Sequence, residues 1–154
     1  MSDTPAVSFH LNGVEVNGAA DASLLQAVRA AGATSVKDGC SPQGQCGCCT
    51  VLVDGDARVA CVTPVARVAG RRVTTVRGLE PTWRDAAAAA LVATGGSQCG
   101  FCTPGFVMSL SALLHNNADA GEESIQDAIA GNLCRCTGYI NIVKAVKRSV
   151  ELMK

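Results

Sequence analysis

The sequence predicts an α+β protein, in which a helix packed on a small sheet is followed by a bundle of four helices. Two patterns support this prediction. Apolar residues alternate with period two through much of the first half, and the period becomes helical near Gly78. A third observation is the presence of nine cysteines among 154 residues. We therefore expect two units, residues 1–78 and 79–154, each near the size at which metals commonly supplement a small core.

The first elements are a hairpin and a helix. In residues 7–17 apolar side chains alternate with polar ones on both sides of an Asn12-Gly13 turn, which is typical of a β-hairpin. His10 lies on the polar phase of this pattern and is expected to be exposed rather than a ligand. Ser23 to Gln26 matches a capping box, which predicts a helix reaching Ala31.

A glycine-rich segment, residues 37–50, follows this helix. Its proline, glycines and small polar residues disfavour regular structure and indicate a loop wrapped around a bound group. Short apolar runs then predict the remaining strands of the sheet, at residues 50–53, 59–61, 65–68 and 72–76. The first unit is therefore expected to be β-grasp-like, with one helix covering the sheet.

Four helices are predicted in the second unit, at residues 82–93, 104–115, 124–130 and from Ile140 onward. We expect Thr82 with Asp85 to cap the first helix, and Thr103 before Pro104 to cap the second. Trp83 is expected to be a packing anchor at the junction of the units. The four helices imply a compact bundle with its cysteine-bearing loops at one end.

Eight of the cysteines fall into two sets of four. One set combines a Cys-x-x-Cys with a Cys-x-Cys, and the other is more widely spaced. The members are Cys99, Cys102, Cys134 and Cys136 in one set, and Cys40, Cys46, Cys49 and Cys61 in the other. Each set can hold zinc or a [2Fe–2S] cluster, and spacing alone does not decide between them. Disulfides are less favoured, because the cysteine count is odd.

Local geometry adds detail to the later set. Cys134 and Cys136 would point in nearly opposite directions on a helix, so we expect an extended or looped segment there, with Arg135 pointing away. Cys102 directly precedes a predicted helix N-terminus, where the helix dipole favours a thiolate.

Composition excludes several classes of protein. The formal net charge is +0, from 13 basic and 13 acidic residues, and no basic stripe interleaved with aromatics suggests nucleic-acid binding. No run is long enough to span a bilayer, and residues 1–5 lack the features of a signal peptide. We expect a protein of the reducing cytoplasm without direct membrane insertion.

Taken together, these motifs resemble the iron–sulfur subunit of the molybdenum hydroxylases, the family of xanthine dehydrogenase, aldehyde oxidoreductase and carbon monoxide dehydrogenase. The motifs that carry the resemblance run in the family's order through nearly the whole chain. They are Gly39-Cys40 with Cys46-Gly47-Cys48-Cys49-Thr50-Val51 and Cys61, then Gln98 to Gly105, then Cys134-Arg135-Cys136-Thr137-Gly138-Tyr139.

The resemblance implies a plant-type ferredoxin domain followed by a four-helix domain, each binding one [2Fe–2S] cluster. It implies a large partner subunit that holds molybdenum–pterin and performs the substrate chemistry, and an FAD-binding medium subunit that receives the electrons. The helical-domain cluster would then be the first acceptor. Gln98 and Cys136 would lie against the pterin, and no catalytic residue would belong to this chain.

One departure concerns the first cysteine set. Plant-type ferredoxins use C-x4-C-x2-C, whereas five residues separate Cys40 from Cys46 here. The extra residue either bulges harmlessly or alters solvent access to that cluster. Cys48 stands where the family has a small residue. We assign Cys49 as the ligand and expect Cys48 to be a small buried filler.

Two other functions are compatible with the cysteine sets. One is a structural zinc-binding module, which would be colourless and redox-silent. The other is a free-standing two-cluster ferredoxin that serves several partners.

Overall fold

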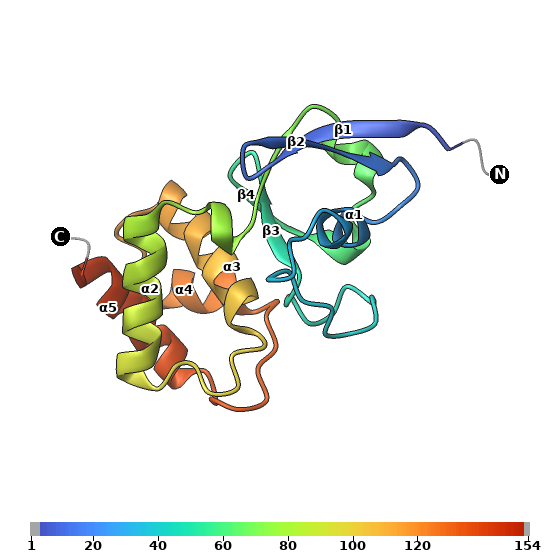
Figure 1. The fold of residues 1–154 in the computed structure, drawn as a ribbon. Coiled ribbons are helices and arrows are strands. Elements are labelled where there is room, and N and C mark those ends of the chain that lie inside the picture. Colours follow the sequence, from blue (N-terminus) through green and yellow to red (C-terminus); the bar gives the residue numbers. More distant parts are fainter. Residues whose placement is uncertain (1–3, 153–154) are drawn as a thin grey trace.

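The computed structural model describes residues 4–152 and contains a sheet unit followed by a helical unit (Figure 1). The predicted α+β class is confirmed. In chain order the strands are β1 (Ala6–Leu11), β2 (Val14–Ala19), β3 (Thr50–Val53), β4 (Asp56–Val59) and β5 (Arg72–Thr74). They form one sheet in the order β2-β1-β5-β3-β4, in which only the β1–β5 pair is parallel.

The N-terminal hairpin and the first helix agree with their predictions. Leu11 pairs with Val14 across the Asn12-Gly13 turn, and the His10 side chain is exposed. The helix α1 (Leu24–Ala30) begins at a complete capping box of Ser23 and Gln26. Its apolar side chains are buried with those of β1, β3 and β5 in one core, so α1 covers one face of the sheet.

The strand predicted at residues 65–68 is wrong, and the strand predicted at residues 59–61 lies earlier in the chain, as β4. Val65–Val68 is instead the short 3-10 helix η2, and its two end residues, Val65 and Val68, are both buried. A 3-10 helix has three residues per turn, so residues three apart share one face, and this spacing explains the burial. Cys61 lies on η1 (Ala60–Val62), because β4 ends at Val59.

The last strand is shorter than predicted. β5 ends at Thr74, and the chain continues into η3 (Val76–Gly78), which leads into the helical unit.

The helical unit contains the four predicted helices; the first three begin slightly earlier than predicted, and the fourth begins at Ile140 as predicted. They are α2 (Pro81–Thr94), α3 (Thr103–Asn116), α4 (Glu122–Ile129) and α5 (Ile140–Leu152). The predicted side-chain caps are wrong. Pro81 opens α2 after Glu80, and α3 is capped by Cys102, in both cases without a side-chain cap bond. Proline is favourable in the first turn because it lacks the N–H that would be unpaired there.

The sheet unit and the helical unit share a packed boundary. Leu52 of β3 is buried with residues of α2 and α3, and Trp83 packs against the same cluster. The Trp83 indole N–H also donates to the Ser111 hydroxyl on α3. These contacts confirm the expected role of Trp83 as an anchor at the junction.

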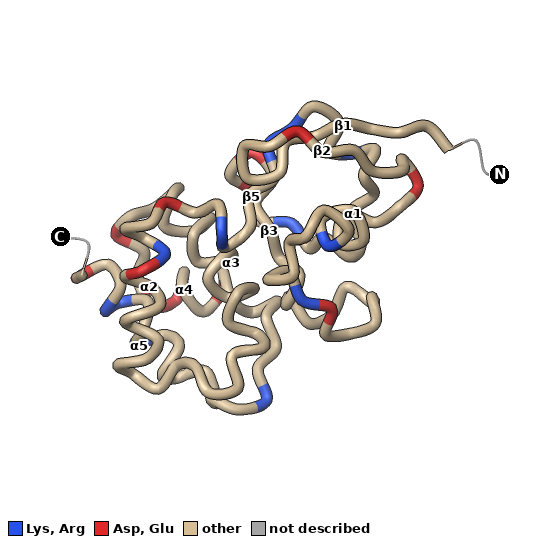
Figure 2. The backbone as a smooth tube through the Cα atoms, viewed as in Figure 1, with Lys and Arg blue, Asp and Glu red and all other residues tan. Residues whose placement is uncertain are grey.

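The cysteine-bearing loops of the helical unit lie together at one end of the bundle, next to the loop between α1 and β3 (Figure 1). Acidic and basic residues are scattered over both units, but the cysteine-bearing loops of the helical unit carry few charges (Figure 2). Within residues 4–152, no helix is long and apolar enough to cross a membrane.

Candidate metal centres

The loop between α1 and β3 gathers three cysteines of the first set, and η1 supplies the fourth. Cys40 and Cys46 are close enough for their thiol groups to interact, as are Cys49 and Cys61. The Cys61 backbone N–H also donates to the Cys49 sulfur over 3.4 Å. The 3-10 turn at Cys61 therefore directs this N–H toward the loop that carries Cys49. The four thiols of this set are arranged as two pairs.

Hydrogen bonds lower the pKa of one thiol of this set, whereas burial raises the pKa of another. Backbone N–H groups of Gln43 and Gln45 lower the pKa of Cys40 to about 6, and the Gln43 N–H lies 3.2 Å from the sulfur. Burial raises the pKa of Cys49 to about 12. A buried thiol of this kind ionises readily only beside a positive charge such as a metal cation.

The extra residue between Cys40 and Cys46 is accommodated at the surface. Ser41 adopts a left-handed conformation with φ 59°, and its N–H donates to the Asp38 carboxylate over 3.0 Å. Residues 41–45 are exposed, whereas residues 46–50 are buried. The longer spacing therefore enlarges the outer turn and leaves the buried half of the loop close to β3.

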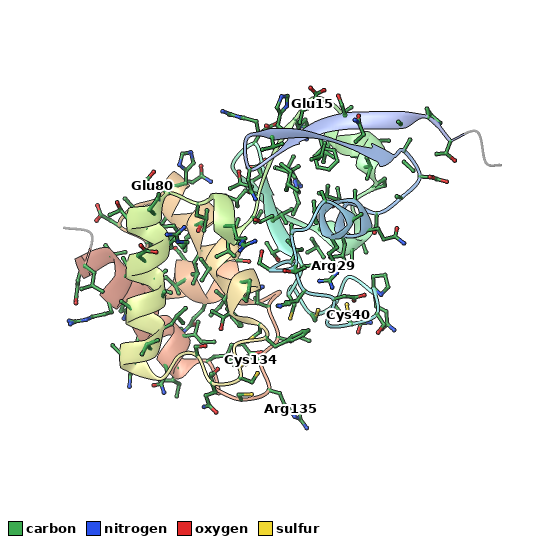
Figure 3. The ribbon with its side chains drawn as sticks, viewed as in Figure 1. Glu15, Arg29, Cys40, Glu80, Cys134 and Arg135 are labelled. Atoms are coloured by element: carbon green, nitrogen blue, oxygen red, sulfur yellow. The ribbon has the colours of Figure 1, made fainter. Side chains whose placement is uncertain are left out.

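The second set is arranged as two pairs as well. The sulfur atoms of Cys99 and Cys136 lie 3.7 Å apart at the exposed end of the helical unit. Cys102 interacts with Cys134 in a half-buried position. Figure 3 shows Cys134 on the loop at the end of the bundle and Arg135 pointing away, as predicted. A cavity of about 560 Å³ is lined by these four thiols together with Cys46 and Cys48 of the other loop.

Cys134 lies in the predicted non-helical segment and receives two hydrogen bonds. Burial by itself raises the pKa of Cys134, but the Thr137 hydroxyl and the Cys136 N–H, at 3.2 and 3.4 Å, lower it to about 7. Thr137 belongs to a motif that carries the family resemblance, but no role was predicted for it from the sequence. A hydroxyl residue directly after a Cys-x-Cys was the available signal.

Cys102 does not behave as its helix position suggested. It is the N-cap of α3, yet burial raises its pKa to about 12. The N-terminal dipole was expected to favour the thiolate, but desolvation of a charge in this half-buried site is the larger effect.

Cys48 and Cys49 are both buried but have different surroundings. Cys49 interacts with Cys61, whereas Cys48 interacts with the Cys46 thiol and also donates weakly to the Cys46 carbonyl over 3.8 Å. Cys48 also borders the cavity of the second set. The Cys48 sulfur thus lies between the two sets of cysteines.

Gln98 and Cys136 meet at the exposed end. Gln98 is exposed, and its side-chain N–H donates to the Cys136 carbonyl over 3.2 Å. The bond goes to nearby backbone, and it holds the two residues together on a surface that a partner can reach.

The pairing of thiols distinguishes between metal types. A [2Fe–2S] cluster with four cysteine ligands takes two thiolates at each iron, whereas a structural zinc ion gathers four ligands around one point. Among residues 4–152, no three His, Cys, Asp or Glu side chains converge as a single ion would require. Two pairs in each set, with N–H and O–H groups directed at sulfur, fit [2Fe–2S] clusters.

Comparison with known proteins leads to the same class. A family model described as "2Fe-2S iron-sulfur cluster binding domain" matches residues 9–67, and one described as "[2Fe-2S] binding domain" matches residues 75–147. The fold and the paired thiols thus define an iron–sulfur protein with two [2Fe–2S]-binding domains.

Relatives identify the family more closely. The nicotinate dehydrogenase small FeS subunit of Eubacterium barkeri is 41% identical over 121 residues, covering 78% of this chain and 76% of that protein. A quinoline 2-oxidoreductase structure from Pseudomonas putida 86 matches with a TM-score of 0.85 and 31% identity, over 99% of this chain and 97% of the matched chain. The chain belongs to the family of iron–sulfur subunits and domains of the molybdenum hydroxylases.

Some relatives are much longer than this chain. The aldehyde oxidoreductase of Megalodesulfovibrio gigas is 46% identical over 143 residues, which cover 88% of this chain but 16% of that protein. The chain likewise spans 11% of the xanthine dehydrogenase of Emericella nidulans. In these proteins the matched region is one part of a larger polypeptide.

Proposed function

We propose that this chain is the electron-transfer subunit of a multi-subunit molybdenum hydroxylase. The single observation that carries the proposal is the presence of two neighbouring sites, each made of two thiol pairs, with cysteines of both bordering one cavity. Two one-electron centres placed side by side are suited to passing electrons through a protein. The family membership supports the same role.

The ligand assignment follows from the thiol pairs. We propose that Cys40 and Cys46 hold one iron of the first cluster and that Cys49 and Cys61 hold the other. In the second cluster, Cys99 pairs with Cys136 and Cys102 with Cys134. The first cluster would belong to residues 1–78 and the second to residues 79–154, a division supported by the separate ranges of the two family models.

When bound, the two clusters supply one-electron carriage between a molybdenum–pterin centre and an FAD or other acceptor. The chain's own residues hold and shield these groups. Buried residues 46–50 exclude water from one side of the first site, while exposed residues 41–45 leave its other side open. The Gln43 N–H and the Thr137 hydroxyl stabilise negative charge on the Cys40 and Cys134 sulfur atoms.

The proposed partners are a large subunit that holds molybdenum–pterin and a medium subunit that binds FAD. The exposed pair of Gln98 and Cys136 would face the pterin. Residues 86–118 contain no Asp, Glu, Lys or Arg, and residues 128–143 contain only Arg135. This charge-poor end suits burial against another subunit, because few charges would have to be desolvated. The cytoplasmic location stays a prediction.

Metal analysis and EPR of the purified protein test the cluster assignment. We expect four irons per chain, little zinc, and two distinct EPR signals after full reduction, because the two sites differ in exposure and hydrogen bonding. Zinc in place of iron, with a colourless and redox-silent protein, would instead establish the structural zinc module.

Purification under native conditions tests the subunit role. Stoichiometric co-purification with a molybdenum-containing large subunit is expected, and mass spectrometry identifies the partners. Recovery of the chain alone, with both clusters intact and reducible by several donors, would favour the free-standing ferredoxin.

A further inference from the structure

Asn132 lies where the two cysteine-bearing regions contact each other. This residue is 3% exposed and lies between α4 and Cys134. Its side-chain N–H donates to the Gly47 carbonyl over 3.0 Å, and its side-chain oxygen accepts from the Ser109 hydroxyl over 2.8 Å. One buried amide thus connects the loop of the first site, the helix α3 and the loop of the second site.

Two glycines make this approach possible. A Cβ atom at Gly105, on the first turn of α3, would lie closer than 3.0 Å to the Gly47 carbonyl oxygen. A Cβ atom at Gly47 would overlap the Gly131 carbonyl oxygen in the same way. Gly47 also has a φ of 66°, which is unfavourable for residues with side chains. The backbones therefore meet without intervening side chains.

The contact lies directly beside ligand residues of both sites. The Leu133 N–H donates to the Cys46 carbonyl over 2.9 Å, and Leu133 precedes Cys134. Gly47, the residue bonded to Asn132, follows Cys46. A shift of the Gly47 loop relative to the segment after α4 would therefore move Cys46 relative to Cys134.

We infer that Asn132 is a positioning residue that sets the separation of the two cluster sites through its bond to Gly47. Asn132 holds the backbone between the two sites in place and does not bond a ligand directly, since neither of its bonded partners is a cysteine. Electron transfer through protein slows steeply with distance, so a residue that fixes this spacing controls the rate between the clusters. The inference rests on the proposed function in taking the eight cysteines as ligands.

The test compares two variants of the full chain in its purified complex. Asn132→Asp keeps the size of the side chain and an acceptor for Ser109, but a carboxylate cannot donate to the Gly47 carbonyl and is repelled by it. Ser149→Ala is the control, because Ser149 is buried in the same unit and bonds the Ala145 carbonyl, away from both cysteine loops.

Dithionite-reduced samples are measured by EPR, where magnetic interaction between two reduced clusters depends on their distance and orientation. We expect Asn132→Asp to keep full iron content and total spin but to lose the inter-cluster splitting of the unmodified protein. Ser149→Ala should keep the splitting. Iron content and total spin report on the proposed function, whereas the splitting reports on this inference alone.

Two outcomes overturn the inference. One is an unchanged splitting in Asn132→Asp at full cluster content. The other is loss of a cluster from the folded variant, which would make Asn132 necessary for assembly instead of spacing. If Asn132→Asp does not fold, Ser109→Ala makes the same measurement, because it removes the hydroxyl that holds the Asn132 amide in place against Gly47.

Discussion

At the scale of single residues, the adjacent Cys48 and Cys49, which lie directly before β3, have different neighbours. Cys49 interacts with Cys61, although both thiols are buried and burial raises the pKa of both to about 12. The similar pKa values do not separate the two thiols, so our assignment of Cys49 as the ligand depends on its neighbours.

Replacing each cysteine in turn tests this assignment. Cys48→Ala should keep both clusters and lower stability by about 1 kcal/mol, since only one buried sulfur is lost. Cys49→Ala should lose the first cluster, because one iron would keep a single thiolate from its pair. Iron content and the two EPR signals provide the measurement, and loss of the first signal in Cys48→Ala would contradict the ligand assignment.

Gln98 gives a second prediction at this scale. Gln98→Ala should leave both clusters assembled, because Gln98 bonds the Cys136 carbonyl and not a sulfur. Reduction of the second cluster by substrate should slow about tenfold if one hydrogen bond at the molybdenum side, about 1.4 kcal/mol, is lost. Rapid-freeze EPR of the assembled complex measures this rate. An unchanged rate would show that Gln98 does not take part in the contact with the partner. Gln126→Ala, at an exposed position of α4, is a suitable control.

At the scale of elements, regular segments followed their sequence patterns and connecting segments did not. The hairpin, α1 and the four later helices appear where periodicity predicted them. The prediction of a strand at Val65–Val68 was wrong because a four-residue segment is too short to separate a strand from a 3-10 turn by its pattern. Cys61 was predicted to lie on a strand. The alternation of apolar residues carries no information about the hydrogen bond from the Cys61 N–H to the Cys49 sulfur, which accompanies the 3-10 turn.

The turn after β3 provides a test of stability at this scale. The Asp54 carboxylate accepts from the Arg72 N–H over 2.9 Å and from the Arg71 guanidinium over 2.8 Å. These bonds, the Arg72 N–H foremost, lower the pKa of Asp54 below its usual 3.8. The ionised carboxylate therefore ties the β3–β4 turn to β5.

Asp54→Asn should reduce the free energy of unfolding at pH 7 by about 0.5–1 kcal/mol, a small value because the pair is partly exposed. The folded pKa lies below the unfolded one, so this contribution is fully present above pH 3.8 and declines as the pH falls below that value. Urea unfolding at pH 7 and at pH 3 should show the two proteins converging in acid. A constant difference at both pH values would show that the charge of Asp54 is not responsible.

At the scale of the whole molecule, the sheet unit has one core and the helical unit has two, and the sheet core and one helical core contain or adjoin cysteines of the two sets. Cys49 and Cys61 are part of the sheet core, and Cys102 and Cys134 pack against one of the helical cores. Metal binding is therefore expected to be coupled to folding in both units.

Removing iron tests this coupling. If the clusters contribute about 4 kcal/mol, the thermal midpoint of the metal-free chain should fall by about 10 °C. Calorimetry before and after chelation under reducing conditions measures the shift. Equal midpoints would show that the loops are stable without metal, and reconstitution with iron and sulfide should restore the original value.

Sequence alone determined the order of the elements, the two cysteine sets, and the family to which the motifs point. These follow from local periodicity and from short motifs such as the segment from Gln98 to Gly105, which need no knowledge of distant contacts. The preference for Cys49 over Cys48 as a ligand was also made from the sequence, by the Cys-x-x-Cys register and the opposed directions of adjacent side chains, and it stays a prediction.

Only the tertiary structure decided how the thiols pair and how the two sites meet. Cys99 pairs with Cys136 across 37 positions in the sequence, and Asn132 reaches Gly47 across 85. Asn132 was passed over because its role depends on the Gly47 and Gly105 backbones approaching each other, and a local pattern contains no such information. Contacts of this kind join residues that are far apart in the sequence, so the structure was needed to find them.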